Sequence, residues 1–193
     1  MYFTLSFSQW LEPDFPINYI YDLTNYIILT LFLYLFIKFR TNLSTRSIYL
    51  YSFLMLSPFL FNGFLIDWYM FPDQSKYVGQ SRIFRGLTFD LDGAFSYYLA
   101  GGNFKVILSS MVYNLFPSTN FETYRSIGFI NRFLYLFMVV FLINKKTIPL
   151  SVKLFLIFSP SLALYSSISL REILILVSMI FLVYNLLNKN YFI

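Results

Sequence analysis

The sequence has no cysteine and no histidine among its 193 residues. These two absences exclude disulfide bonds, thiolate metal ligands and imidazole acid–base chemistry. Charged residues are scarce as well, at 12% of the chain, whereas an ordinary soluble domain has about 25%. Any proton transfer or ligand binding must therefore use carboxylates, amines, guanidinium groups, tyrosines or the backbone.

Hydrophobic residues fill the chain instead. They make up 58% of it, compared with about 45–50% in a soluble domain. Several apolar runs approach the length that a helix needs to cross a hydrocarbon core of about 30 Å. We therefore expect an all-α fold, a polytopic membrane helix bundle with about five transmembrane helices. The predicted spans are residues 21–37, 47–67, 127–143, 150–164 and 172–187.

Basic residues set the predicted orientation. Lys38, Arg40 and Arg46 follow the first span, and Lys145 and Lys146 follow the third. Positively charged loops stay on the cytoplasmic side, so the N-terminus is predicted outside and the C-terminus in the cytoplasm. The net charge of +5 comes mostly from such loops and does not indicate nucleic-acid binding. The expected location is the bacterial inner, or plasma, membrane.

The predicted domain organisation is an external N-terminal tail, residues 1–20, followed by a single membrane domain, residues 21–193. A large external loop, about residues 68–124, separates the second and third spans. Within this loop, the stretch KVILSSMVYNLF has an apolar run of only about ten residues, too short to cross a membrane. We expect it to be an interfacial helix on the external surface.

Three groups of polar residues fall on the external side of this topology. They are Asp67, Asp73, Lys76, Arg82 and Arg85 in the loop; Arg125, Asn131 and Arg132 at the third span; and Arg171 with Glu172 between the fourth and fifth spans. Polar groups from distant parts of a sequence that meet at one membrane surface are the arrangement expected of a site.

Asn131 and Arg132 are the most informative of these residues because they lie about a turn inside the third span. A charge in hydrocarbon costs about 2.5–3.5 kcal/mol even on a lenient scale. Arg132 should therefore face a partner or a wet cavity. The alternative is that its side chain extends to the nearby outer interface.

The other groups also have ordinary structural explanations. Arg171 and Glu172 can simply begin a helix, where a carboxylate meets the positive end of the helix dipole. Asp73 follows Pro72, and this position favours an N-cap role as much as catalysis. Lys76 and the other basic residues of the loop can form the solvated face of an amphipathic helix.

Three stretches carry a recognisable pattern: FPDQSKYVGQSRIFR, NLFPSTNFETYRSIGFINRFLYLFMVVFLINKK and FSPSLALYSSISLREILILVSMIFLVYN. The first has a Pro-Asp pair followed by Tyr at the opening of a surface helix. The second has an Arg and an Asn before a span that ends in basic residues, and the third has Pro-Ser near the outer end of one span and Arg-Glu opening the next. Over about residues 48–187 this order resembles the polytopic GT-C glycosyltransferases, the group that includes protein O-mannosyltransferases and lipid A aminoarabinose transferases.

The resemblance implies an enzyme that takes a sugar from a polyprenyl-phosphate lipid donor and transfers it to an acceptor at the external membrane face. Asp73, which matches the family's loop carboxylate, would be the general base, with Asp67 in reserve. Basic residues would bind the donor phosphate and stabilise charge on the leaving group. In order of preference these are Arg132, Arg171, Lys76 and Arg82, and the supporting residues are Glu172, Asn131 and Arg125.

The chain departs from the family in length, because family members usually continue through further spans and often a soluble external domain. It also has an extra span before the family-like region. Three explanations are open: a truncated or split copy, a partner chain that supplies the missing helices, or the architecture without the activity.

Two other functions are also open. A polysaccharide polymerase uses lipid-linked sugars too, although the sequence lacks a second large external loop with basic pairs. A non-catalytic membrane subunit or lipid-binding protein of envelope glycan assembly would use the polar groups only to bind a partner or a headgroup. The sequence contains no P-loop, dinucleotide fingerprint or metal-ligand cluster, so no cofactor is expected. A carboxylate-bound divalent metal stays open as an alternative, without support from a motif.

Overall fold

The computed structural model describes residues 19–66, 70–71, 73–86, 104–115, 123–145, 148–168 and 170–187. Over these residues the regular structure is helical, which confirms the predicted all-α class. The helices are α2 (Tyr19–Arg40), α3 (Thr45–Leu54), α4 (Ser57–Phe61), α5 (Asp73–Gly86), α7 (Phe104–Asn114), α8 (Tyr124–Ile143), α9 (Leu150–Phe158), α10 (Pro160–Tyr165) and α11 (Glu172–Leu187).

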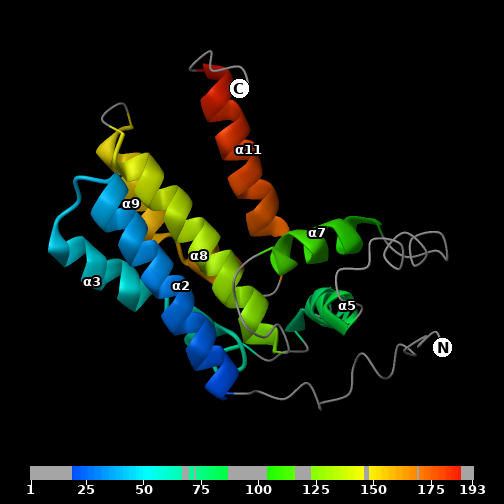
Figure 1. Ribbon diagram of the computed structural model, residues 1–193. Helices are drawn as coiled ribbons and strands as arrows, with labels where there is room; N and C mark the ends of the chain where they lie inside the picture. The colour runs from blue at the N-terminus through cyan, green and yellow to red at the C-terminus, as the bar shows by residue number, and fades with distance from the viewer. Residues whose placement is uncertain are drawn as a thin grey trace.

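Helix α8 is the centre of the bundle (Figure 1). Helices α2, α4, α5, α9 and α11 all pack against it. Helices α2, α8 and α11 run in the same general direction, and α5 and α7 lie at the end of the bundle where α8 and α11 begin (Figure 1). One end of the molecule is thus built from three helix N-termini and two short helices.

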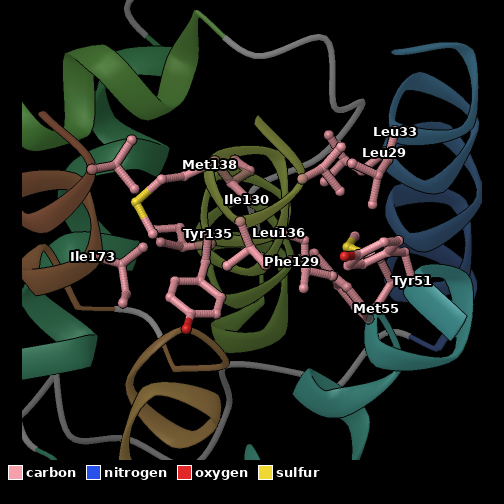
Figure 2. Close-up of a cluster of buried hydrophobic side chains, with 14 of the residues drawn as sticks. Leu29, Leu33, Tyr51, Met55, Phe129, Ile130, Tyr135, Leu136, Met138 and Ile173 are labelled. Atoms are coloured by element: carbon pink, nitrogen blue, oxygen red, sulfur yellow. The ribbon is translucent and has the colours of Figure 1, made fainter. Parts of the chain in front are cut away.

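The hydrophobic core is arranged around α8. Figure 2 shows Leu29 and Leu33 of α2 on one side of α8, and Ile173 of α11 on the other. The middle layer comes from α8 itself and includes Phe129, Ile130, Leu136 and Met138. Because α8 supplies apolar side chains in both directions, the core depends on it more than on any other helix shown.

Three of the predicted spans correspond to single helices. The segments predicted at 21–37, 127–143 and 172–187 lie within or coincide with α2, α8 and α11. Two helices of the described chain are long and apolar enough to cross a membrane: α2 from Asp22 to Arg40, and α8. The 20 residues of α8 reach about 30 Å at 1.5 Å per residue, which equals the hydrocarbon thickness. The 16 residues of α11 reach only about 24 Å.

The other two predicted spans are each divided into two short helices. The segment 47–67 contains α3 and α4, with Pro58 in the first turn of α4. The segment 150–164 contains α9 and α10, and the chain between them is extended at Ser159, where φ is −64° and ψ is 117°. A residue before proline is pushed out of the helical region, so Pro160 ends α9 and starts α10.

Helices α2 and α11 each present an apolar face on the outside of the bundle. Leu23, Ile27 and Leu31 of α2 are each more than half exposed, and their spacing of four residues puts them on one helix face. Met179 and Val183 do the same on α11. Soluble monomers rarely expose contiguous apolar patches of more than a few hundred Å². Together with the two long apolar helices, these faces indicate a membrane protein.

The stretch predicted to be a short helix in the large loop is α7. It packs against α5, and the hydroxyl of Ser110 donates a hydrogen bond of 3.5 Å to the backbone oxygen of Tyr77. The predicted N-terminal tail up to residue 18 lies outside the described residues.

Candidate functional site

Charged side chains act on Tyr77 of α5, at the end of the bundle where α5, α7 and the start of α11 lie (Figure 1). Asp73 is the first residue of α5, and its carboxylate accepts a hydrogen bond of 2.6 Å from the ammonium group of Lys76 one turn later. Both side chains are exposed. Arg171 and Glu172 stand at the first turn of α11, where Glu172 is exposed and Arg171 is half-buried.

The phenol of Tyr77 is affected by these charges. Burial raises the pKa of Tyr77 to about 12, Arg171 acts to lower it, and Glu172 and Asp73 act to raise it. Tyr77 thus lies within electrostatic reach of Asp73, Arg171 and Glu172, which come from segments about 100 residues apart in the sequence. A phenol with so high a pKa stays neutral at physiological pH and can serve as a hydrogen-bond donor. We call Asp73, Lys76, Tyr77, Arg171 and Glu172 the Tyr77 cluster.

A second tyrosine lies beneath this cluster. The hydroxyl of Tyr113 in α7 donates to Oδ1 of Asn131, at 3.0 Å, and also lies 3.0 Å from the backbone oxygen of Leu170. Burial raises the pKa of Tyr113, so it too is neutral. The amide nitrogen of Asn131 donates to the backbone oxygens of Ile168 and Leu170, at 2.8 and 2.6 Å. Asn131 therefore fastens the segment leading into α11, including the position of Arg171, to α8.

Arg132 has a different environment from its neighbour Asn131. It is 2% exposed, its Nε donates to the backbone oxygen of Leu54 at 2.9 Å, and its Nη1 donates to Oγ of Ser166 at 2.7 Å. Its guanidinium also lies 5.7 Å from the ring centre of Tyr135. These partners belong to α3, α8 and the turn after α10, and none is a member of the Tyr77 cluster.

Arg125 belongs to a buried network at the start of α8. Its Nη1 lies 3.6 Å from Oδ2 of Asp22 in α2, and its Nε donates to the backbone oxygen of Asn62 at 2.9 Å. The side-chain amide of Asn62 in turn donates to Oε1 of Gln74 in α5, at 3.3 Å. All four side chains are buried. Arg125 thus faces protein partners and not an open site.

The predicted site residues fall into two environments. Asp73 pairs with Lys76, and Asp73, Arg171 and Glu172 act electrostatically on Tyr77, whereas Arg132, Arg125 and Asn131 are buried and hydrogen-bonded to other segments. Asp67 lies outside the described residues, and so do the side chains of Arg82 and Arg85.

Sequence reasoning did not single out Tyr113 or Asp22, and it noted Tyr77 only as the tyrosine that follows the Pro-Asp pair in the family-like pattern. A signal existed for Asp22, because an acid in the first turn of an otherwise apolar span calls for a partner just as Arg132 does. Tyr113 had no such signal, since the chain contains 17 tyrosines and only tertiary packing distinguishes this one.

Metal binding has no visible support in the part of the chain that is described, where no three His, Cys, Asp or Glu side chains are grouped to hold an ion. Comparison with family models, with curated proteins and with solved structures finds no match to this chain.

Proposed function

We propose that this chain is a membrane glycosyltransferase-like protein that acts on a polyprenyl-phosphate-linked sugar at the external face of the membrane. The observation that carries the proposal is the Tyr77 cluster, in which Asp73 pairs with Lys76, and the charges of Asp73, Arg171 and Glu172 act on the neutral phenol of Tyr77. Such a mixture suits a substrate with an anionic headgroup and an apolar tail.

Each side chain of the cluster has a proposed role. Arg171 and Lys76 bind the donor phosphate, because both supply charged donors near the helix ends. Asp73 takes the proton from the acceptor hydroxyl. Glu172 orients Arg171 or contacts the acceptor. Asp67 and Arg82 keep their predicted roles as reserve base and further phosphate ligand.

In this proposal Arg132 supports the fold around the site and does not bind the donor phosphate. The sequence had instead placed it first among the phosphate ligands. Its described hydrogen bonds go to Leu54 and Ser166, so it acts by holding the interrupted helices around α8. Asn131 acts in a comparable way by fixing the chain before Arg171.

The proposed topology has five crossings, with the N-terminus outside and the C-terminus inside. In it, α3 with α4, and α9 with α10, cross as interrupted helices, which is tolerated where freed backbone groups find partners inside the protein. The backbone oxygen of Leu54 at the end of α3 is such a freed group, and Arg132 is its partner. Helices α5 and α7 then lie at the external interface.

The experiment is a transfer assay in proteoliposomes, with a panel of radiolabelled polyprenyl-phosphate hexoses and a cell-envelope extract as the acceptor source. Asp73→Asn should lower turnover by about 10²- to 10⁴-fold, since the amide cannot accept a proton, with unchanged donor binding. Arg171→Gln should instead weaken donor binding about tenfold, the loss of one charge-assisted hydrogen bond. Ser178→Ala, which removes only a hydroxyl bonded within α11, is the control.

A non-catalytic lipid-binding subunit is the second candidate, and the ion pair between Asp73 and Lys76 in the first turn of α5 favours it. A protein of this kind would bind the donor without releasing sugar and would tolerate Asp73→Asn. If the unmodified protein neither binds nor turns over any donor of the panel, both candidates are wrong.

A further inference from the structure

A buried chain of polar contacts links α2 to the first turn of α5 through α8. It consists of Asp22, Arg125, Asn62 and Gln74, and we call it the Asp22–Gln74 network. The atoms follow one another from the Asp22 carboxylate to Nη1 of Arg125 at 3.6 Å, from Nε of Arg125 to the backbone oxygen of Asn62 at 2.9 Å, and from Nδ2 of Asn62 to Oε1 of Gln74 at 3.3 Å.

Neighbouring hydroxyls and backbone groups fix each step of the network. The hydroxyl of Thr123, which caps α8, donates to Oδ1 of Asp22 at 2.5 Å. Nδ2 of Asn62 also lies 3.1 Å from the backbone oxygen of Tyr124. A Cβ added at Gly128 would come within 3.6 Å of the same amide nitrogen. Asn62 is therefore enclosed between the start of α8 and α5.

Stability alone does not explain this arrangement. Taking a carboxylate, a guanidinium and two amides out of water is costly, and well-packed apolar side chains often stabilise a fold equally well. Hydrogen bonds add direction, because each one fixes the relative placement of two elements. Here the last bond ends at Gln74, the residue after Asp73.

We propose that the Asp22–Gln74 network is a positioning device that fixes the first turn of α5, and with it Asp73 and Lys76, against α2 and α8. Its consequence for sugar transfer rests on the proposed function, whereas the placement of α5 does not. In this proposal Asn62 and Thr123 are positioning residues for the Tyr77 cluster. They act through Gln74 and Asp22 and have no described hydrogen bond to a member of that cluster.

The test is a distance measurement between α2 and α5. Since the chain has no cysteine, spin labels can be attached to Ile27→Cys and Lys76→Cys, both exposed positions, and measured by pulsed EPR in nanodiscs. Asn62→Ala should broaden or shift the distance distribution. A distribution as narrow as that of the otherwise unmodified protein would overturn the proposal.

Two substitutions at Thr123, one to valine and one to serine, keep the proposal testable if Asn62→Ala fails to fold. Thr123→Val removes the hydroxyl that donates to Asp22 and accepts from the backbone nitrogen of Ser126. It should broaden the distribution, whereas Thr123→Ser, which keeps the hydroxyl, should preserve it. Thr30→Ala in α2, away from the network, should leave it unchanged. Equal distributions for Thr123→Val and Thr123→Ser would contradict the positioning role.

The transfer assay separates this inference from the proposed function. Thr123→Val should lower kcat/KM for the donor roughly tenfold, because it misplaces both the base Asp73 and the phosphate ligand Lys76, and Thr123→Ser should restore it. If the variants alter the spin-label distance but no protein, including the unmodified one, transfers sugar, the proposed function is wrong and the positioning role stands. If the unmodified protein transfers sugar and the variants leave the distance unaltered, the positioning role is wrong and the proposed function stands.

Discussion

Arg132 bonds two groups that lie where helices end. The backbone oxygen of Leu54 belongs to the last turn of α3, whose carbonyls lack partners within the helix. Ser166 lies directly after α10. By donating to both, the guanidinium joins two interrupted segments to α8. Its removal should therefore weaken the fold as a whole.

Arg132→Met should lower the free energy of unfolding by about 1–3 kcal/mol, the cost of leaving a buried acceptor without its donor. Unfolding in mixtures of detergent and SDS measures this quantity. Lys153→Met is a matched control, because Lys153 also donates to a backbone oxygen at a helix end, that of Ile143, but is less buried. Equal losses for the two variants would argue against the role given to Arg132.

Gly128 permits a close approach between α8 and the backbone of Ser167. A Cβ at this position would lie 2.4 Å from the backbone oxygen of Ser167, a separation that side chains do not reach without a shift of the chain. Gly128→Ala should therefore destabilise the protein by about 1–3 kcal/mol through overpacking. The same unfolding measurement applies, and an unchanged midpoint relative to Ser178→Ala would refute the expectation.

At the scale of the element, α2 offers the clearest test of membrane crossing. Leu31 lies near the middle of the helix and is 54% exposed, while Phe39 lies near its end, next to Lys38 and Arg40, and is 70% exposed. In lipid, Leu31→Lys should cost about 2.5–3.5 kcal/mol, whereas Phe39→Lys should cost much less because it lies at the interface. The fraction of α2 inserted into membranes, compared between the two variants, gives the answer. If α2 faced water, both lysines would be accepted equally.

Elements defined by local interactions could be predicted from the sequence, and elements defined by contacts between distant residues could not. Helices α2, α8 and α11 were predicted because long apolar runs are a local signal. The interruptions at Pro58 and Pro160 were not predicted as complete breaks, because a proline in an apolar run can also leave a kinked helix. The outcome depends on tertiary partners such as Arg132, which lies 78 residues from the carbonyl of Leu54 that it holds.

The candidate site shows the same division. Asp73, Arg171 and Glu172 were found as charges in an apolar chain, and the predicted topology put all three on the external side. The separation of Arg132 from them could not be predicted, because Asn131 and Arg132 are adjacent in sequence but point to different partners around α8. Sequence spacing on a helix indicates a direction, and only the packing of α3, α7 and α10 shows what lies there.

At the scale of the whole molecule, the orientation can be measured with single cysteines in a chain that has none of its own. The proposed topology places Lys76 outside and Phe39 inside. A membrane-impermeant maleimide should label Lys76→Cys in intact cells, and it should label Phe39→Cys only after the membrane is permeabilised. The opposite pattern would invert the topology and move the Tyr77 cluster to the cytoplasmic side.

The central position of α8 has a consequence for how the protein is made. Asp22 receives its hydrogen bond from Thr123, 101 residues later in the chain. At about 5–20 residues per second, the ribosome needs about 5–20 s to supply that partner. During this interval α2 carries a carboxylate that the finished protein buries completely. The burial of Asp22 is therefore completed only after the start of α8 has been made, so the packing of α2 onto α8 is a late step in the biogenesis of this bundle.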